Sequence, residues 1–359
     1  MYCCSNCFCD SEIKAIIDGN KKVGNCDFCG SKNANVYEIG QDQTLSDMFD
    51  GLLDTYMPAS NLPDDFPKES TDLIKNILCY KWHIFNLEAD GIYKLITAIC
   101  ADRYAEESEL FDSPVGIPQS QDYEYLESNS ILKNHCWDDF VEEIKFRNRF
   151  HSNFINTDML FTFLRCASKS YKARKVFYRA RLCPDENGFT KKEMGPPPDG
   201  KSSGGRVNPT GIQVLYLSNS EETTLYEIRA GVYDYVTVGR FILSEDIEVI
   251  NLAGIDKISP FIGVQYGFDF TQYAINIEPL KMIGKEIAKP LRNDNSLDYL
   301  PTQYISDYIR SKKYDGIEYV STMHPSGVNL AIFDKSKFKC TSVSVYDVKT
   351  ISYSYDRLK

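Results

Sequence analysis

The sequence predicts an α+β protein: a cysteine-rich start, a helical region, and a C-terminal half of short strands with few helices. Three observations predict this order. Four cysteines form two close pairs before residue 30, apolar residues recur at helical spacing between residues 41 and 170, and short strand-like runs alternate with turns from residue 172 onward. We therefore expect a segment 1–40, a helical domain 41–171, a domain 172–345 and an extension 346–359.

Composition places the chain among ordinary globular proteins. It has 359 residues, of which 43% are hydrophobic and 25% charged, enough for two to three domains. No apolar run approaches the roughly 20 residues of a membrane span, and the N-terminus lacks the pattern of a secretory signal. Twelve scattered cysteines without such a signal indicate reduced thiols. We expect a cytoplasmic protein without a membrane partner.

The charge is unevenly distributed. Residues 1–171 carry a net charge of −13 and residues 172–359 one of +2. Binding to a nucleic-acid backbone requires a basic surface, so the first half is not expected to bind nucleic acid.

The first segment carries a metal-binding pattern. Cys4-x2-Cys7 is followed after eighteen residues by Cys26-x2-Cys29, the pair spacing of a four-cysteine zinc site. Such a site is closed by four sulfurs and is structural. Cys3 and Cys9 remain alternative ligands in the first pair.

Residues 41–170 are predicted to be mainly helical. Apolar side chains share helical faces in three stretches, namely Leu73, Ile74, Ile77 and Leu78; Ile92, Leu95, Ile96 and Ile99; and Leu160, Phe161 and Leu164. The polar stretch 112–129 contains two prolines and is expected to be a loop.

An arginine and a histidine near the end of this region resemble the motif of HEPN ribonucleases. Arg147 and His151 enclose three residues, fewer than that family places between them. The acidic charge of this half also disfavours RNA binding. A helical HEPN-like fold without catalysis is the expectation, and a HEPN-type ribonuclease is the alternative.

The C-terminal half contains six strand-like runs, at 176–181, 214–217, 233–242, 247–252, 316–320 and 328–333. A helix is expected at 302–313, where Tyr304, Ile305, Tyr308 and Ile309 share a face. Residues 191–205 lack apolar periodicity and are expected to form a loop beside the site, in the position of a lid.

A glycine-rich stretch, Gly204 to Gly211, dominates this half. It carries Arg206, leads into a strand that carries Tyr216, and is followed by a helix at 219–228 that carries Glu227. Ser218 and Glu221 are spaced like a capping box at the start of that helix. Glycines allow close approach of a ligand, and an arginine fork suits phosphate oxygens.

These residues closely resemble the RES domain, a bacterial family named for its arginine, glutamate and serine. The stretch 204–228, the opening strand 176–181, the segment 314–321 and the closing strand 328–333 lie in the family's order. The resemblance covers about residues 172–345. It implies an ADP-ribosyltransferase-like β core and consumption of NAD as substrate, with release of nicotinamide.

The resemblance also implies roles for particular residues. Arg179 and Arg206 would hold the NAD phosphates. Glu227 would position the ribose and offset positive charge at its C1 atom, and Tyr216 would stack on nicotinamide. Ser321 would hydrogen-bond the ribose or the carboxamide and is not expected to be a nucleophile. Asn329 is a further cofactor-binding candidate.

We expect an NAD-degrading enzyme, a bacterial toxin or defence effector that acts beside an antitoxin or regulatory protein. The acidic first half could regulate access to the site. A rival from another class is a non-catalytic interaction protein built on the zinc segment. The sequence leaves open whether phosphate, water or a protein side chain accepts the ADP-ribosyl group, and whether the protein is a homo-oligomer.

Overall fold

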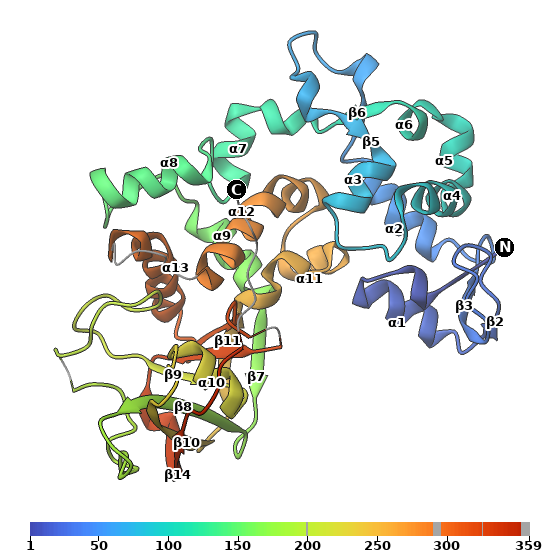
Figure 1. Ribbon diagram of the computed structural model, residues 1–359. Coiled ribbons are helices and arrows are strands. Elements are labelled where there is room, and N and C mark those ends of the chain that lie inside the picture. The colour runs from blue at the N-terminus through green and yellow to red at the C-terminus, as the bar shows by residue number, and fades with distance from the viewer. Residues whose placement is uncertain (199, 290–295, 325, 353–359) are drawn as a thin grey trace. The chain divides into compact units, whose positions relative to one another are not determined.

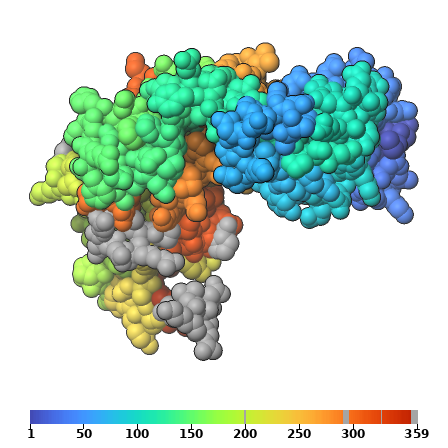
Figure 2. Space-filling model, turned by 90° about the horizontal axis from the view of Figure 1, so that it is seen from above, coloured from blue at the N-terminus to red at the C-terminus, as the bar shows by residue number. Residues whose placement is uncertain are grey.

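The computed structural model describes residues 1–198, 200–289, 296–324 and 326–352. The chain forms two compact units that alternate along the sequence (Figure 1). The first unit comprises Met1–Cys136, Asn153–Phe163 and Asp256–Leu280, and the second comprises Trp137–Ser152, Leu164–Ile255 and Lys281–Lys359. In the space-filling view the long N-terminal part of the first unit is blue to green (Figure 2). None of the described helices is long and apolar enough to cross a membrane.

The first unit begins with a small sheet and one helix. The sheet has the order β1-β3-β2, from β1 (Tyr2–Cys4), β2 (Val23–Gly24) and β3 (Ala34–Glu38). Helix α1 (Ser11–Gly19) begins where the Asp10 carboxylate accepts from the backbone N–H groups of Glu12 and Ile13, which satisfies two donors that the first turn leaves free.

Short helices form most of the rest of this unit: α2 (Thr44–Leu53), α3 (Ile74–Tyr80), α4 (Ala89–Ile99), α5 (Ala101–Glu106), α6 (Glu109–Asp112) and α7 (Tyr123–Asn129). A second small sheet has the order β4-β6-β5, from β4 (Met57–Pro58), β5 (Asp72–Leu73) and β6 (Pro114–Gly116). The loop expected at 112–129 is therefore wrong, because this stretch contains β6 and α7. No side chain of α7 is buried, so the helix leaves no apolar period in the sequence.

A segment from the C-terminal half completes the first unit. It holds α11 (Gly263–Tyr266) and the beginning of α12 (Phe270–Ala288). The Tyr273 ring, 2% exposed, lies 5.2 Å from Trp82, and Asn276 Oδ1 accepts from the backbone N–H of Ile131 at 2.6 Å. The sequence analysis did not predict α12. Its interior Pro279 and the buried polar Asn276 obscure the apolar pattern.

The second unit is built on an eight-stranded sheet of order β14-β10-β8-β9-β13-β12-β11-β7. Its strands are β7 (Ser168–Tyr171), β8 (Val176–Cys183), β9 (Leu215–Ser218), β10 (Tyr235–Leu243), β11 (Ile247–Asn251), β12 (Gly316–Val320), β13 (Val328–Ile332) and β14 (Phe338–Asp347). All neighbours pair antiparallel except β11 and β12. The six expected strands are present, with ends shifted by at most a few residues.

Strand β14 was not predicted, since 328–333 was expected to be the closing strand. It pairs with β10 along its length and lies at the edge of the sheet. Phe338 is its one fully buried residue, so the strand lacks the alternation that marks a half-buried strand. The extension expected from residue 346 begins within the last residues of β14.

Helices accompany this sheet. They are α8 (Trp137–Glu142), α9 (Thr157–Cys166), which contributes its last residues here, α10 (Glu221–Glu227) and α13 (Leu300–Ser311). The capping box expected at Ser218 is wrong. Ser220 caps α10, because its hydroxyl accepts from the backbone N–H of Thr223.

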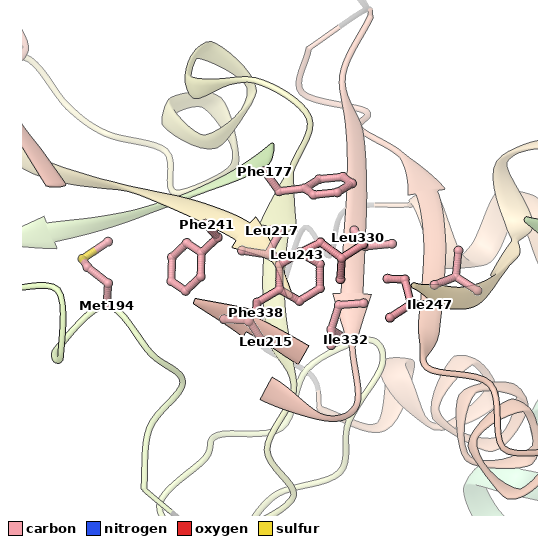
Figure 3. Packing of buried hydrophobic residues seen from close by; sticks show 11 residues of the cluster. Phe177, Met194, Leu215, Leu217, Phe241, Leu243, Ile247, Leu330, Ile332 and Phe338 are labelled. Carbon is pink, nitrogen blue, oxygen red and sulfur yellow. The ribbon is translucent and has the colours of Figure 1, made fainter. Parts of the chain in front are cut away.

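Apolar side chains on one face of the sheet form a core (Figure 3). They come from six strands and one loop, and include Phe177, Leu215, Leu217, Leu330 and Phe338. Side chains alternate between the two faces of a strand. Tyr216, Ser218 and Asn329, next to these core residues in sequence, therefore belong to the opposite face.

Candidate active site

A cavity of about 320 Å³ lies beside β9 in the second unit. Strands β8, β9, β12 and β13, helix α10 and the glycine-rich loop all contribute to its wall. The lining residues are Tyr178, Arg179, Ala180, Gly205, Arg206, Tyr216, Leu217, Ser218, Thr224, Glu227, Ile228, Tyr299, Tyr319 and Asn329. The cavity thus combines two arginines, one carboxylate and several tyrosines.

Arg179 lies where β8 and β9 diverge. The two strands pair only at Tyr178 and Ser218, and the Arg179 guanidinium donates to the Tyr216 carbonyl at 3.2 Å. Its Nε–H is buried and has no acceptor among the described residues. Burial lowers the pKa of Arg179 to about 10, and the nearby Arg181 charge adds to that effect. Within the described ranges this cation thus has no anionic partner, which a charge held away from water favours.

The glycine-rich loop holds Arg206 at the cavity. Gly205 donates its N–H to the Asn208 carbonyl at 2.8 Å, and Gln303 donates from Nε2 to the carbonyls of both residues. A β-carbon on Gly205 would lie 2.9 Å from the Tyr216 hydroxyl, so the close fit requires glycine.

Part of the hydrogen-bonding capacity of the Arg206 guanidinium is used by the protein itself. It donates to the carbonyls of Ile287 and Ala288, each at 2.9 Å, at the end of α12. A cation at a helix C-terminus interacts favourably with the free carbonyls there. The same guanidinium lies 5.5 Å from the centre of the Tyr319 ring.

Tyr216 presents a fixed ring to the cavity. Its hydroxyl donates to Asn208 Oδ1 at 2.6 Å, and burial raises its pKa. Asn208 in turn donates from Nδ2 to carbonyls of its own loop. Through Asn208, the Tyr216 hydroxyl therefore stabilises the conformation of the glycine-rich loop.

Glu227, at the end of α10, is held by two donors. Its Oε1 accepts from Ser321 Oγ at 2.5 Å and from Asn329 Nδ2 at 2.8 Å. Ser218 Oγ donates to Asn329 Oδ1 at 2.7 Å, which fixes the orientation of the Asn329 amide. Within the described part of the chain, Glu227 Oε2 has no hydrogen-bond partner.

The Ser321 hydroxyl makes three hydrogen bonds, and the one that it donates goes to Glu227. Its hydroxyl accepts from the backbone N–H groups of Met323 at 3.2 Å and His324 at 3.1 Å. A hydroxyl has a single hydrogen to donate, and here that hydrogen goes to Glu227. His324 contacts Thr223 Oγ1 through Nδ1 at 2.9 Å and stacks on Tyr226.

The four predicted metal ligands come together in the first unit. Their sulfurs all lie within 4.8 Å of one another, with Cys4 to Cys29 and Cys7 to Cys26 both 3.4 Å apart. Tetrahedral zinc with Zn–S bonds of about 2.3 Å requires sulfurs about 3.8 Å apart, so these thiols fit a zinc ion. Cys9 instead donates to the Phe85 carbonyl, and Cys3 is not a member of the cluster.

The Cys26 turn has the form of a metal-binding knuckle. Its sulfur accepts from the backbone N–H groups of Phe28 and Cys29, and Gly30 takes a positive φ of 72°. Left-handed backbone favours glycine at this position.

The contacts recorded for Arg147 and His151 among the described residues are with other residues. Arg147 forms an exposed ion pair with Glu142 at 2.6 Å, and the His151 backbone bonds to the Asn148 side chain. Arg147 ends a short π-helix (Glu143–Arg147), and His151 lies in the following turn.

Comparison with known proteins identifies the C-terminal half. The family model of the RES domain matches residues 176–356, about half of the chain. The chain belongs to the RES domain family. No curated protein matches it. A similar solved structure is a chain of the M. tuberculosis MbcT–MbcA toxin–antitoxin complex, with 11% identity and a TM-score of 0.30 over 52% of this chain and 92% of that chain.

Within the RES domain, the structure brings the predicted site residues to one place. Arg179, Arg206, Tyr216, Glu227 and Asn329 line the cavity, and Ser321 contacts it through Glu227. Their roles stay predictions.

The sequence analysis missed several residues of the RES domain site. Tyr319, Tyr299 and Ser218 line the cavity, while Asn208 and Gln303 hold the loop. Asn208 carried a signal, because asparagine before proline in a glycine-rich stretch indicates a built turn. The others carry no signal by type or spacing.

Proposed function

We propose that the protein degrades NAD by cleaving the bond between nicotinamide and ribose. The observation that carries the proposal is one cavity that combines Arg179, whose buried Nε has no acceptor among the described residues, with a carboxylate oriented by two donors, Glu227. Membership of the RES domain family supports the same conclusion through the activity that the resemblance implies.

The arginines suit the pyrophosphate. Arg179 is half-buried and has no anionic partner among the described residues, and a phosphate oxygen would supply the missing acceptor at its buried Nε. Arg206 donates to two carbonyls through Nη1, which leaves its other N–H groups for a second phosphate oxygen. In this arrangement Arg179 binds more of the ligand charge than Arg206.

Glu227 suits the reacting ribose. Loss of nicotinamide leaves positive charge on the ribose ring, and a carboxylate nearby stabilises that charge in the transition state. With Oε1 taken by Ser321 and Asn329, Oε2 is the oxygen that would accept from a ribose hydroxyl or face the developing cation. Ser321 and Asn329 are then positioning residues. Tyr216 contributes its ring, because its hydroxyl is bound to Asn208.

The test is incubation of the full-length protein with NAD, with and without phosphate, and identification of products by mass spectrometry. Free nicotinamide is expected, and the ribosyl product reveals whether water, phosphate or protein is the acceptor. Glu227→Gln should lower turnover by about 10² to 10³, while Glu221→Gln on the same helix should not. A folded Glu227→Gln protein with parental turnover would exclude the proposal.

We further propose that this activity makes the protein a bacterial toxin or defence effector that an antitoxin or regulatory partner restrains. Expression in bacterial cells should deplete NAD and stop growth, and Glu227→Gln should do neither. Loss of RNA with intact NAD would instead favour the ribonuclease alternative.

Regulation by the acidic first half rests on its charge of −13 against +2 for the rest, since an acidic surface competes with anionic ligands for arginines. If the purified full-length protein turns NAD over as fast as an uninhibited enzyme does, the first half does not inhibit the site in the absence of a partner.

The cysteine cluster is proposed to hold one structural zinc ion through Cys4, Cys7, Cys26 and Cys29. Four thiolates leave no open coordination position for a substrate, so the ion would stabilise the N-terminal fold and take no part in NAD cleavage.

A further inference from the structure

A second cavity of the RES domain, also about 320 Å³, lies at the opposite end of the β9–β13 ladder. Its wall includes Gln213 and Leu215 at the start of β9, Phe333 and Lys335 just beyond β13, and Arg310 from α13. The first cavity uses Ser218 and Asn329 at the other end of the same two strands.

Two cations reach this second cavity, and among the described residues neither forms an ion pair, although Asp307 interacts electrostatically with Arg310 and Asp334 with Lys335. Arg310 donates to the carbonyls of Phe333 at 3.1 Å and Gln213 at 3.5 Å, and the described residues give it no ion pair. Lys335, which is exposed, donates from Nζ to Gln213 Oε1 at 2.9 Å.

The Gln213 amide supplies a third donor. Because Lys335 can only donate, the amide oxygen must face Lys335, and this fixes the NH₂ group on the other side. That Nε2 is buried and has no acceptor among the described residues. A buried donor without a partner is unfavourable, and an acceptor oxygen in the cavity would satisfy it.

The one carboxylate in the wall is engaged elsewhere. Asp334 Oδ1 accepts from both the backbone N–H and the hydroxyl of Ser336. Among the lining residues two cations outnumber this one carboxylate, while Asp307, outside the wall, offsets part of the Arg310 charge. The apolar side chains of Ile212 and Phe333 line the remaining space.

We propose that this second cavity binds a small phosphorylated molecule. Its phosphate oxygens would accept from Arg310, Lys335 and Gln213 Nε2, and its organic part would rest on Phe333 and Ile212. A dianion matches two cations and a neutral donor. The volume exceeds that of a phosphate ion alone, which is why an organic phosphate is the class we infer.

The second cavity is joined to the glycine-rich loop by hydrogen bonds. The Ile212 carbonyl accepts from Asn208 Nδ2 at 2.9 Å, and Asn208 Oδ1 accepts from Tyr216 in the first cavity at 2.6 Å. Gly211, with φ of 88°, allows the turn between them. A ligand on Gln213 would therefore immobilise the 209–213 turn, and this effect does not depend on NAD cleavage.

The test measures binding of inorganic phosphate by calorimetry to full-length protein carrying Arg179→Gln, which weakens anion binding in the first cavity. Arg310→Gln in this background should weaken phosphate binding on the order of tenfold to a hundredfold, and Lys335→Gln should weaken it several-fold. Lys339→Gln, which removes an exposed lysine outside the cavity, is the matched control and should leave the affinity unchanged. Phosphate should also slow amide hydrogen exchange in residues 209–214.

Two results would overturn the proposal. One is phosphate affinity that stays the same in Lys335→Gln and Arg310→Gln. The other is the absence of any phosphate binding once Arg179 is replaced. The surface position of Lys335 keeps the test valid if Arg310→Gln fails to fold.

Discussion

Ser218 touches no reacting atom in the proposed mechanism, yet it determines which atom of Asn329 faces Glu227. Without the Ser218 hydroxyl, the Asn329 amide can rotate and present its oxygen to the carboxylate. We expect Ser218→Ala to lower kcat for NAD cleavage by roughly tenfold, less than Glu227→Gln, because one of two donors to Glu227 is impaired.

A double-mutant cycle separates positioning from packing. Ser218→Ala and Asn329→Ala should be strongly non-additive in kcat, because both act through the same oxygen of Glu227. Ser218→Thr keeps the hydroxyl and should recover part of the loss. Additive effects of the two alanine substitutions would contradict the positioning role.

We expect Arg179 to destabilise the ligand-free fold and to strengthen NAD binding. Its Nε is buried, and among the described residues its guanidinium has one carbonyl acceptor and no anion, so the folded protein bears a desolvation cost that a ligand would offset. Arg179→Met should leave the melting temperature of the ligand-free protein equal or higher, and should abolish the increase that NAD produces. Thermal unfolding with and without NAD measures both, and a marked loss of stability without ligand would show that Arg179 is structural.

At the scale of elements, contact between α10 and the loop after β12 aligns Glu227 with Ser321. Gly327 lies in this contact, where an added β-carbon would come within 2.6 Å of Thr223 and 2.8 Å of Ser321. Gly327→Ala should displace α10 and reduce NAD turnover by about tenfold or more, since small misplacements of reacting groups are costly. Gly195→Ala, where a β-carbon meets no atom within 4 Å, should have parental turnover.

The same elements show what sequence alone could predict. The glycine-rich loop and β9 were predicted because glycines and an apolar run of strand-forming residues have strong local preferences, and α10 was predicted although the residue that caps it is Ser220 and not Ser218. Strand β14 and helix α7 were missed because they bury few side chains. The hydrogen bonds of Ser218 and Gln303 and the contact of the Tyr319 ring with Arg206 connect segments far apart in sequence, so no local sequence pattern indicates them.

At the scale of the whole molecule, metal binding should decide whether the N-terminal segment folds. Purified protein should contain one zinc ion per chain, and replacing both Cys26 and Cys29 by serine should remove it. Cys9→Ser should retain the ion, because this thiol bonds to the Phe85 carbonyl outside the cluster. Chelation should melt this segment, as binding free energy is folding free energy in small zinc sites, and circular dichroism would record the loss. Full zinc content in the double serine variant would refute the assignment.

The alternating course of the chain limits how such a protein could be switched on. Residues 256–280 lie within the span of the RES domain match, yet they pack in the first unit through Phe268, Tyr273 and Ile277. A protease that cut near residue 170 would sever the backbone without freeing the N-terminal part, because these side chains would still hold it. We therefore expect that one cut there would not release the first half, and that any restraint it exerts is lifted reversibly, by a partner or a ligand.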